Sequence, residues 1–285
     1  MIEINKDLIR EILPKRPKNS SKGDFGKVLC ITGSKKYPGA GFLSAIAALR
    51  AGAGYSILCS EDDVINNYIN MSPDLIFQSH RNFNANFVKQ IIEKNNVNSI
   101  VIGCGISTAD NVVDFMDKFL DFIKEFNIPM VIDADGLNCI SMLNRTDIKN
   151  KTVLTPHPKE LSRLIGVCSE YIQADREHFT IFAQEKYNNT ILLKGCNTLI
   201  GDVDKKIYKN PTGNSSLAKA GTGDVLSGLI GGFLAQKVLP VNAAILAAYI
   251  HGLAADIYAG EYGEYSLLAS DLLNYIPLAF KKALR

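Results

Sequence analysis

Short, mostly apolar segments alternate with longer amphipathic ones along most of the chain. Short apolar runs bounded by turn residues are typical of strands that are buried on both faces of a sheet. Such runs occur at 27–32, 55–59, 99–102, 130–132, 152–154 and 190–193. A hairpin is expected where the segments 199–201 and 206–208 flank Asp202 and Asp204.

Helical patterns separate these runs. In the segment 110–126, apolar residues recur at the spacing of one helix face: Val112, Met116, Phe119, Leu120 and Ile123. Further helices are expected at about 41–51, 158–165, 172–187, 224–236, 241–258 and 269–282. The alternation predicts an α/β fold in which helices cover both faces of a mostly parallel sheet. With no repeat or linker in view, residues 1–285 are expected to form one domain.

The carboxyl ends of the strands are where a parallel sheet binds its ligands. The turns at these ends contain Gly33, Gly103, Asp133, the segment 155–158 and the segment 194–198. These turns and the glycine turn described next are therefore the candidate site.

The segment Gly221-Thr222-Gly223-Asp224 directly precedes an apolar helix. Two glycines allow a close backbone approach, and the free amides of a helix start suit a phosphate. Asp224 would then be a general base for a hydroxyl that attacks a phosphoryl group. The alternative is an ordinary aspartate cap after a flexible turn. An ordinary cap would not need the polar, turn-rich segment 210–214 and Lys219 that precede this turn. They therefore favour the phosphate-binding interpretation.

Three other turns carry candidate chemistry. Lys194 and Thr198 follow a strand and could hold a nucleotide, or could form a solvated surface turn. The prolines on either side of His157 restrict the backbone there, which suits a group held at a ligand, although a structural histidine fits equally well. Asp133 and Asp135 could bind magnesium indirectly, orient water or cap the next helix.

Charge and composition exclude several function classes. The 31 basic and 29 acidic residues leave a net charge of +2, so nucleic-acid binding has little electrostatic support. No uninterrupted apolar run approaches the ~18 residues of a membrane helix. The six cysteines are scattered, without a CxxC pair, which disfavours zinc and disulfides and favours a cytoplasmic protein. The GxxxxGK[ST], GxGxxG and GxSxG motifs are also missing from the expected places.

Taken together, these segments resemble the ADP- or ATP-dependent NAD(P)H-hydrate dehydratases of the ribokinase-like superfamily. The matching motifs, in chain order, are Lys22-Gly23-Asp24-Phe25-Gly26-Lys27-Val28, Gly39-Ala40-Gly41, Ala48-Leu49-Arg50-Ala51-Gly52-Ala53-Gly54, Asp133-Ala134-Asp135-Gly136-Leu137-Asn138, Thr155-Pro156-His157-Pro158-Lys159-Glu160, Leu193-Lys194-Gly195 with Thr198, Asn210-Pro211-Thr212-Gly213-Asn214, and Ala220-Gly221-Thr222-Gly223-Asp224-Val225-Leu226-Ser227-Gly228. The GxGD turn alone is shared with many kinases, whereas the TPHP and DADGLN segments in this order are more specific. The resemblance implies a three-layer α/β/α fold.

One segment departs from the family pattern. The turn Gly103-Cys104-Gly105-Ile106-Ser107 lacks the proline and the last glycine of the usual Gly-Pro-Gly-Leu-Gly sequence. This departure affects the expected shape of the loop more than the expected activity. The chain also has no spare length for the epimerase domain to which family members are sometimes fused, so an epimerase is expected on a separate chain.

The activity implied by the resemblance is the repair of hydrated NADH and NADPH. ADP or ATP phosphorylates the ring hydroxyl, phosphate leaves, and NAD(P)H is restored; the sequence leaves the donor open, and the resemblance favours ADP. Magnesium would bridge the phosphates, with no metal site made by protein side chains alone. The implied site residues are Asp224 as the base; Gly221, Thr222 and Gly223 as the anion hole; Lys194, Gly195, Cys196, Asn197 and Thr198, with Gly223, for the nucleotide; and Ala40, Gly103 or Gly105, His157 and Asp224 for the hydrate.

Two alternative functions compete with this one. A kinase of the same fold would phosphorylate a thiazole or pyrimidine alcohol and keep the product. A catalytically silent nucleotide-sensing protein or scaffold would not need Asp224. Binding to nucleic acid or membranes is not expected, and the resemblance implies a homotetramer.

Overall fold

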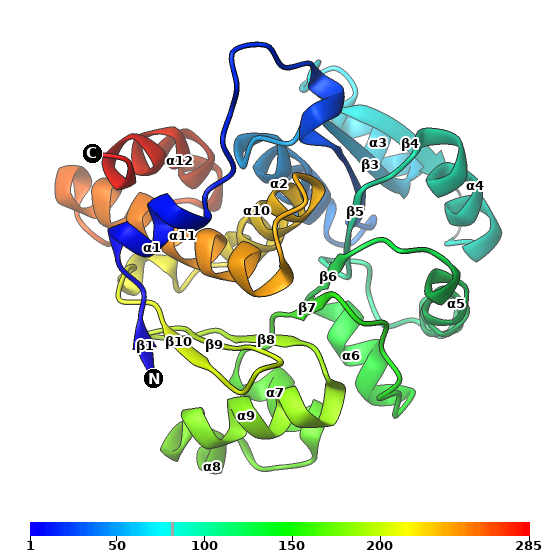
Figure 1. The fold of residues 1–285 in the computed structure, drawn as a ribbon. Coiled ribbons are helices and arrows are strands. Elements are labelled where there is room, and N and C mark those ends of the chain that lie inside the picture. Colours follow the sequence, from blue (N-terminus) through cyan, green and yellow to red (C-terminus); the bar gives the residue numbers. More distant parts are fainter. Residues whose placement is uncertain (81–82) are drawn as a thin grey trace.

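One continuous sheet forms the centre of the molecule. The computed structural model describes residues 1–80 and 83–285, and in these residues ten strands pair in the order β1-β10-β9-β8-β7-β6-β5-β2-β3-β4 (Figure 1). The strands are β1 (Ile2–Glu3), β2 (Lys27–Ile31), β3 (Tyr55–Glu61), β4 (Ile76–His80), β5 (Ser99–Ile102), β6 (Met130–Ile132), β7 (Thr152–Leu154), β8 (Thr190–Leu193), β9 (Leu199–Gly201) and β10 (Ile207–Lys209).

Most neighbouring strands run parallel, as the sequence predicts. Among the ten strands described, only β9 runs against its neighbours, β8 and β10, in the expected hairpin. Side chains along each central strand alternate between the two faces. In β2, Val28 and Cys30 pack into one core, and Leu29 and Ile31 pack into the other. Burial on both faces explains why the strands have continuous apolar sequences.

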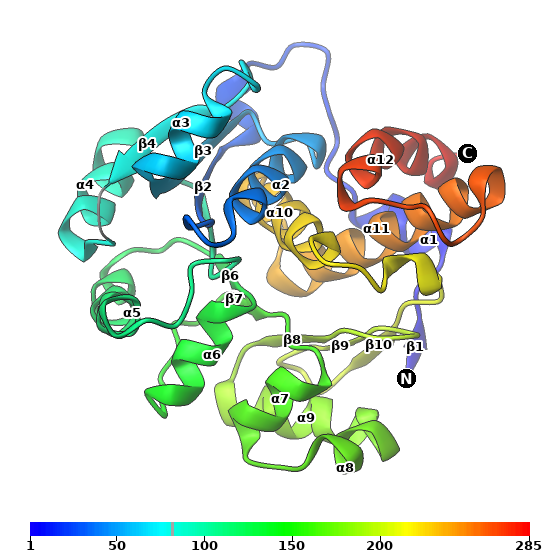
Figure 2. The ribbon, with the colours of Figure 1, turned by 180° about the vertical axis from the view of Figure 1, so that it is seen from behind.

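Helices form a layer on each side of the sheet. The helices are α1 (Lys6–Ile12), α2 (Pro38–Arg50), α3 (Asp62–Tyr68), α4 (Ala85–Asn95), α5 (Asp110–Phe122), α6 (Asp135–Met142), α7 (Pro158–Ile165), α8 (Ser169–Ala174), α9 (Arg176–Tyr187), α10 (Thr222–Ala235), α11 (Pro240–Tyr262) and α12 (Ala269–Ala283). Helices α1–α3 and α10–α12 pack into one core and α4–α9 into the other, as the two opposite views show (Figures 1 and 2). The predicted α/β/α layering is confirmed.

The structure corrects several element boundaries. The helix predicted at 172–187 is two helices, α8 and α9, because the Asp175 side chain accepts a hydrogen bond from the His178 amide and begins a new helix. Helix α6 begins at Asp135, in a stretch where the sequence analysis listed no helix, although it allowed Asp133 and Asp135 to cap one. The prediction missed β1 and β4, which are the edge strands, and α1 and α3, which have 7 residues each. It also missed α4, whose buried residues Val88, Ile91 and Ile92 do have helical spacing.

Helix α11 is the one helix, among the residues described, that is long and apolar enough to cross a membrane by length and composition. Its most apolar stretch is 78% buried within the structure. A core helix with this degree of burial passes the same simple test, so the helix is weak evidence for a membrane span.

Candidate functional site

A pocket of about 420 Å³ opens at the carboxyl ends of the central strands. The chain leaves β2 for β3 on one side and later returns to β5 on the other, and such a reversal leaves a crevice in the sheet edge. The pocket walls are Tyr37, Gly39, Ala40, Leu43, Gly105, Asp135, Ala220, Gly221 and Asp224. They come from the start of α2, the turn after β5, the start of α6 and the start of α10.

Some of the predicted residues meet in this pocket. Ala40, Gly105, Gly221 and Asp224 line it, and Thr222 and Gly223 belong to the same turn as the last two. Gly103, His157 and the segment 194–198 do not belong to these walls. Their contact with a ligand stays a prediction.

The turn before α10 has the geometry of an anion site. Gly221 has a φ of +91°, and a Cβ there would lie 2.8 Å from both Leu43 Cδ1 and Ala269 Cβ, so only glycine fits without strain. The first helical bond runs from the Val225 amide to the Gly221 carbonyl, at 3.2 Å. The amides of Gly223 and Asp224 come before the Val225 amide in the chain, so they make no hydrogen bond within the helix. They lie at the positive end of the helix dipole, where an anion can accept from them.

Asp224 is a partly buried carboxyl in the pocket wall. Burial raises its pKa to about 7, and the nearby negative charge of Asp133 adds to this increase. A hydrogen bond from Cys104 and the charge of Lys194 oppose it. The carboxyl therefore exchanges a proton near neutral pH, as a general base requires. The prediction of a reactive carboxyl at this position is consistent with this environment.

A buried ion pair lies under the glycine turn. Lys194 Nζ is 2.7 Å from Asp133 Oδ1 and 3.6 Å from Glu160 Oε2, and Asp133 is only 2% exposed. The charge and hydrogen bonds of Lys194, joined by the Ser227 hydroxyl, lower the pKa of Asp133 against the effect of burial. A Cβ on Gly223 would lie 3.7 Å from both Asp133 Oδ2 and Lys194 Nζ. Lys194 thus lies within reach of the turn, although in this structure it is paired with carboxylates.

His157 caps a helix. Its Nδ1 accepts a hydrogen bond from the Glu160 amide at 3.2 Å, and the Glu160 carboxylate accepts one from the His157 amide at 2.8 Å. Because Nδ1 accepts, the proton of the neutral ring is on Nε2. Burial lowers the pKa of His157, despite the opposing charge of Glu160. Of the two interpretations that the sequence left open, the structure gives direct support to the structural one.

The unusual turn after β5 is held by the turn after β6. A Cβ on Gly103 would lie 2.1 Å from the Asp133 carbonyl oxygen, so glycine is required for this contact. Ser107 adopts a φ of +71°, and its amide donates to Asp135 Oδ2 at 2.8 Å. Ala134, between the two aspartates, has a φ of +49°, a strained conformation of the kind found at functional sites.

Arg176 supports the loop that follows β8. Its guanidinium donates to the carbonyl oxygen of Leu193 at 3.1 Å and to that of Cys196. A Cβ on Gly195 would lie 3.1 Å from Arg176 Nη2. The loop 194–198 is therefore wrapped around a half-buried cation that the sequence analysis did not single out.

Helix α11 holds the loop that leads into the glycine turn. Asp256 accepts hydrogen bonds from the Gly213 amide at 2.9 Å and from the Asn214 side chain at 2.8 Å. The Asn210 side chain donates to the Ala248 carbonyl at 3.1 Å. The turn-rich segment 210–214 is thus a defined structure rather than a flexible linker.

Metal ligands are sparse. In the described residues 1–80 and 83–285, no group of three or more His, Cys, Asp or Glu side chains is placed to hold a metal ion. The carboxylates of Asp135 and Asp224 face the pocket and are hard oxygen donors, the type that Mg²⁺ prefers. A magnesium ion here would need the phosphates of a nucleotide to complete its coordination.

Sequence reasoning missed several members of the site. Ser227 follows Asp224 by one helical turn and faces the same buried cluster, a relation that helical spacing predicts. Tyr37, Leu43 and Ala220 complete the pocket walls. Ala220 belongs to the motif that contains the glycine turn, whereas Tyr37 and Leu43 flank the Gly39-Ala40-Gly41 motif and are placed in the wall only by the fold.

Comparison with known proteins identifies the family. The family model for NAD(P)H-hydrate dehydratase matches residues 28–278. The ADP-dependent (S)-NAD(P)H-hydrate dehydratase of Bacillus subtilis is 31% identical over 276 residues, which cover 96% of each chain. The bifunctional NAD(P)H-hydrate repair enzyme of Coxiella burnetii is 37% identical over 265 residues, 93% of this chain and 52% of that protein. This chain thus spans about half the length of its bifunctional relatives.

Solved structures agree with this comparison. The Bacillus subtilis ADP/ATP-dependent NAD(P)H-hydrate dehydratase, co-crystallised with ATP and Mg²⁺, superposes with a TM-score of 0.87 at 30% identity and covers 98% of this chain and 97% of that one. A ribokinase-like superfamily protein from Enterococcus faecalis superposes with a TM-score of 0.86 at 26% identity, over 99% and 96% of the two chains. The chain therefore belongs to the NAD(P)H-hydrate dehydratase family and has its ribokinase-like fold.

Proposed function

We propose that this chain dehydrates hydrated NADH and NADPH in a reaction driven by ADP or ATP. The observation that carries the proposal is the position of Asp224. Its carboxyl lines the pocket beside the open amides of α10, with a pKa raised to about 7. A base and an anion site thus meet at one point, as phosphoryl transfer to a hydroxyl requires.

The reaction has two stages. First, the hydroxyl oxygen of the hydrated ring bonds to the terminal phosphorus of the nucleotide, the bond to the leaving AMP or ADP breaks, and Asp224 takes the hydroxyl proton. Second, the ring carbon–oxygen bond breaks, phosphate leaves with the electron pair, and the neighbouring ring carbon releases a proton to restore the double bond. Phosphorylation is needed because phosphate leaves far more readily than hydroxide.

Each part of the site has a proposed task. The turn Gly221-Thr222-Gly223 forms the anion hole for the transferred phosphoryl group, and the amides of Gly223 and Asp224 are the donors that precede the first helical hydrogen bond. The loop 194–198, with Gly223, holds the nucleotide, and Arg176 keeps that loop in place. The hydrate lies against Ala40 and Gly105 in the pocket. Contacts to the hydrate from Gly103 and His157 rest on the family resemblance.

Magnesium fits this arrangement as a partner of the phosphates. Asp135 is the carboxylate that we propose to hold it, through water, because Asp133 is already paired with Lys194. When bound, the ion would neutralise charge on the phosphate oxygens. The protein side chains keep the tasks of binding, orientation and proton transfer.

The test is an assay with hydrated NADH, Mg²⁺ and either ADP or ATP. Reduced-nicotinamide absorbance should return together with release of one phosphate per turnover. The Asp224→Ala variant should fold but lose about 10²–10⁴-fold in rate. The exposed Asp74→Asn is the matched control and should keep full activity. Unchanged turnover in Asp224→Ala would remove the mechanism.

The same assay separates the dehydratase from a kinase of the same fold. A vitamin-precursor kinase would consume nucleotide only with its own alcohol and would accumulate a phosphorylated product without release of phosphate. The choice between ADP and ATP follows from comparing the two donors. The homotetramer, the epimerase on a separate chain and the cytoplasmic location stay predictions; light scattering tests the first.

A further inference from the structure

His251 lies directly against the turn that begins α10. It belongs to α11 and is only 7% exposed, and its Nε2 is 2.9 Å from the Thr222 carbonyl oxygen. A carbonyl oxygen can only accept, so Nε2 must carry the hydrogen. Burial lowers the pKa of His251 to about 4, so the ring is neutral at pH 7. The one N–H hydrogen of the neutral ring therefore points from Nε2 to the Thr222 carbonyl oxygen.

The carbonyl that His251 contacts shares a peptide plane with the Gly223 amide. The described peptide bonds include no cis bond, and in a trans unit the C=O and the N–H point in opposite directions. A donor that holds the Thr222 carbonyl toward α11 also holds the Gly223 amide toward the opposite side. That side is the open start of α10, where the anion site lies.

The Gly223 end of this peptide has the fewest constraints of its own. The Thr222 side chain is held, since its hydroxyl lies 2.9 Å from the carbonyl oxygens of Leu217 and Lys219, whereas Gly223 has no side chain to restrict rotation. The first turn of a helix is also the part that frays most readily. A hydrogen bond to the carbonyl polarises the peptide as well, which strengthens the amide as a donor.

We propose that His251 is a positioning residue for the anion-binding turn. By donating to Thr222, it orients the Gly223 amide and strengthens it as a donor to the transferred phosphoryl group. His251 lies outside the pocket walls, so it acts through the backbone rather than on the substrate. The proposal rests on the proposed function and deepens it.

Substitutions that keep or remove the Nε2 donor test this role. The side-chain amide of Gln can replace an imidazole Nε2–H, whereas Leu has similar bulk and no donor. We expect His251→Leu to lower kcat about tenfold and to change KM for the hydrate less than threefold, because the amide acts mainly on charge in the transition state. His251→Gln should recover most of the lost kcat. The exposed His178→Gln is the control.

A measurement independent of turnover separates this proposal from the proposed function. In wild-type protein at pH 7, nitrogen NMR should show the His251 ring as the neutral Nε2–H tautomer. The Gly223 amide resonance should move in His251→Leu and return toward the wild-type position in His251→Gln. A neutral ring with its proton on Nδ1, or a Gly223 amide resonance that stays at the same position in both variants, would overturn the role of His251.

The outcomes are distinguishable. If wild-type protein fails to turn over hydrated NADH, the proposed function fails, and the NMR result still decides the role of His251. If the Gln variant loses as much kcat as the Leu variant while both are fully folded, His251 is only a core residue. If the Leu variant does not fold, the tautomer of the His251 ring in the wild type and the kcat of the Gln variant test the role of His251 instead.

Discussion

Burial of Asp224 links the chemistry of the pocket to the stability of the protein. The folded-state pKa is about 7, against an ordinary value of 3.8. Between these pH values the folded protein keeps a proton that the unfolded chain releases. The folded state is therefore destabilised as pH rises from about 4 to about 7, and the full penalty is present above pH 7.

Asp224→Asn should remove this penalty. At pH 8 the variant should have a free energy of unfolding higher than the wild type, by up to about 4 kcal/mol, and near pH 4 the difference should vanish. Urea unfolding of both proteins at the two pH values measures this. Asp74→Asn, which is exposed, should show no such trend. A difference independent of pH would mean that Asp224 is not a proton-exchanging group.

Arg176 is a residue whose effect should fall on nucleotide binding. The guanidinium donates to backbone carbonyls of the loop 194–198 and the strand before it, and burial lowers its pKa. Arg176→Ala should raise KM for the nucleotide about tenfold, equivalent to one or two lost charge-assisted hydrogen bonds, with kcat at saturation nearly unchanged. Steady-state kinetics with varied nucleotide measure this. The exposed Arg50→Ala is the control; equal KM values in both variants would exclude a support role.

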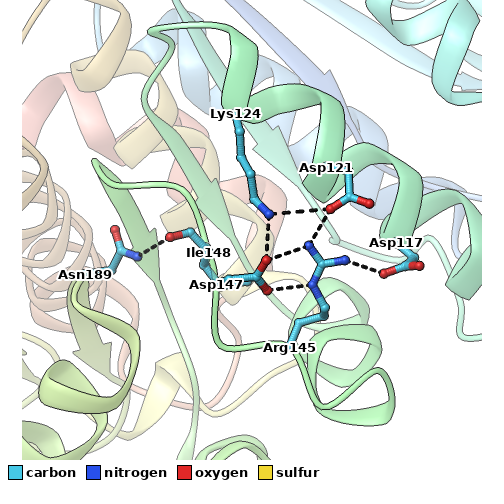
Figure 3. A network of polar contacts seen from close by, with 7 residues as sticks. All are labelled: Asp117, Asp121, Lys124, Arg145, Asp147, Ile148 and Asn189. Atoms are coloured by element: carbon cyan, nitrogen blue, oxygen red, sulfur yellow. Dashed lines mark hydrogen bonds and ion pairs between the residues drawn. The ribbon is translucent and has the colours of Figure 1, made fainter.

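At the scale of elements, an ion-pair network joins α5 to the connection between α6 and β7 (Figure 3). Arg145 Nη1 is 2.6 Å from Asp117, its Nη2 is 2.6 Å from Asp121, and its Nε is 2.7 Å from Asp147. Lys124 lies 2.6 Å from Asp147. The Arg145 side chain is only 17% exposed, so solvent screens it less than an ordinary surface cation.

Removing the centre of this network should destabilise the protein without affecting catalysis. Arg145→Met should lower the free energy of unfolding by about 1–3 kcal/mol at neutral pH. Hydrogen bonds from Arg145 and Lys124 hold the pKa of Asp147 below its usual range, so the stabilisation should disappear as pH falls below about 4. Lys118→Met removes only the exposed pair with Asp114 and should cost less than about 0.5 kcal/mol. Equal losses in the two variants would contradict this account.

The sequence predicted elements best where their pattern was least ambiguous. The strands at 99–102, 130–132, 152–154 and 190–193 and the helix at 158–165 have the predicted bounds. Their apolar runs are buried on both faces or end at prolines and glycines, so local chemistry decides them. Helix α6 was missed because its segment DGLNCISM begins with turn-forming residues, and packing against the sheet makes it helical.

At the scale of the whole molecule, the position of the glycine turn depends on how closely α10 approaches the sheet. A Cβ on Gly231 would lie 2.2 Å from Val101 Cγ2 in β5, and the Ser99 hydroxyl donates to the Gly231 carbonyl at 2.7 Å. A larger residue would push α10 away from the sheet. The turn that carries Asp224 would move with the helix.

Gly231→Ala should therefore reduce both stability and activity. We expect a loss of about 1–3 kcal/mol in the free energy of unfolding and a lower kcat, since α10 carries the base. Gly260→Ala is the matched control: among the residues that the structure describes, no atom lies within 4 Å of its added Cβ, so the change should stabilise α11 by up to about 1 kcal/mol. Chemical denaturation and steady-state kinetics of the two variants provide the comparison. Similar behaviour of both would show that the helix-to-sheet distance is not critical.

The sequence alone determined the fold class, the succession of the central strands and helices along the chain and the glycine turn with Asp224, because apolar periodicity and local turn chemistry act over a few residues. It also indicated the family, through the resemblance of its motifs. Only the tertiary structure decided which of the candidate residues meet. It paired Lys194 with Asp133 and made His157 a helix cap. It also brought Arg176 against the backbone of the loop 194–198 and His251 against the backbone of the glycine turn. These contacts join positions far apart in the chain, and they depend on strand order and helix packing, which no local pattern records.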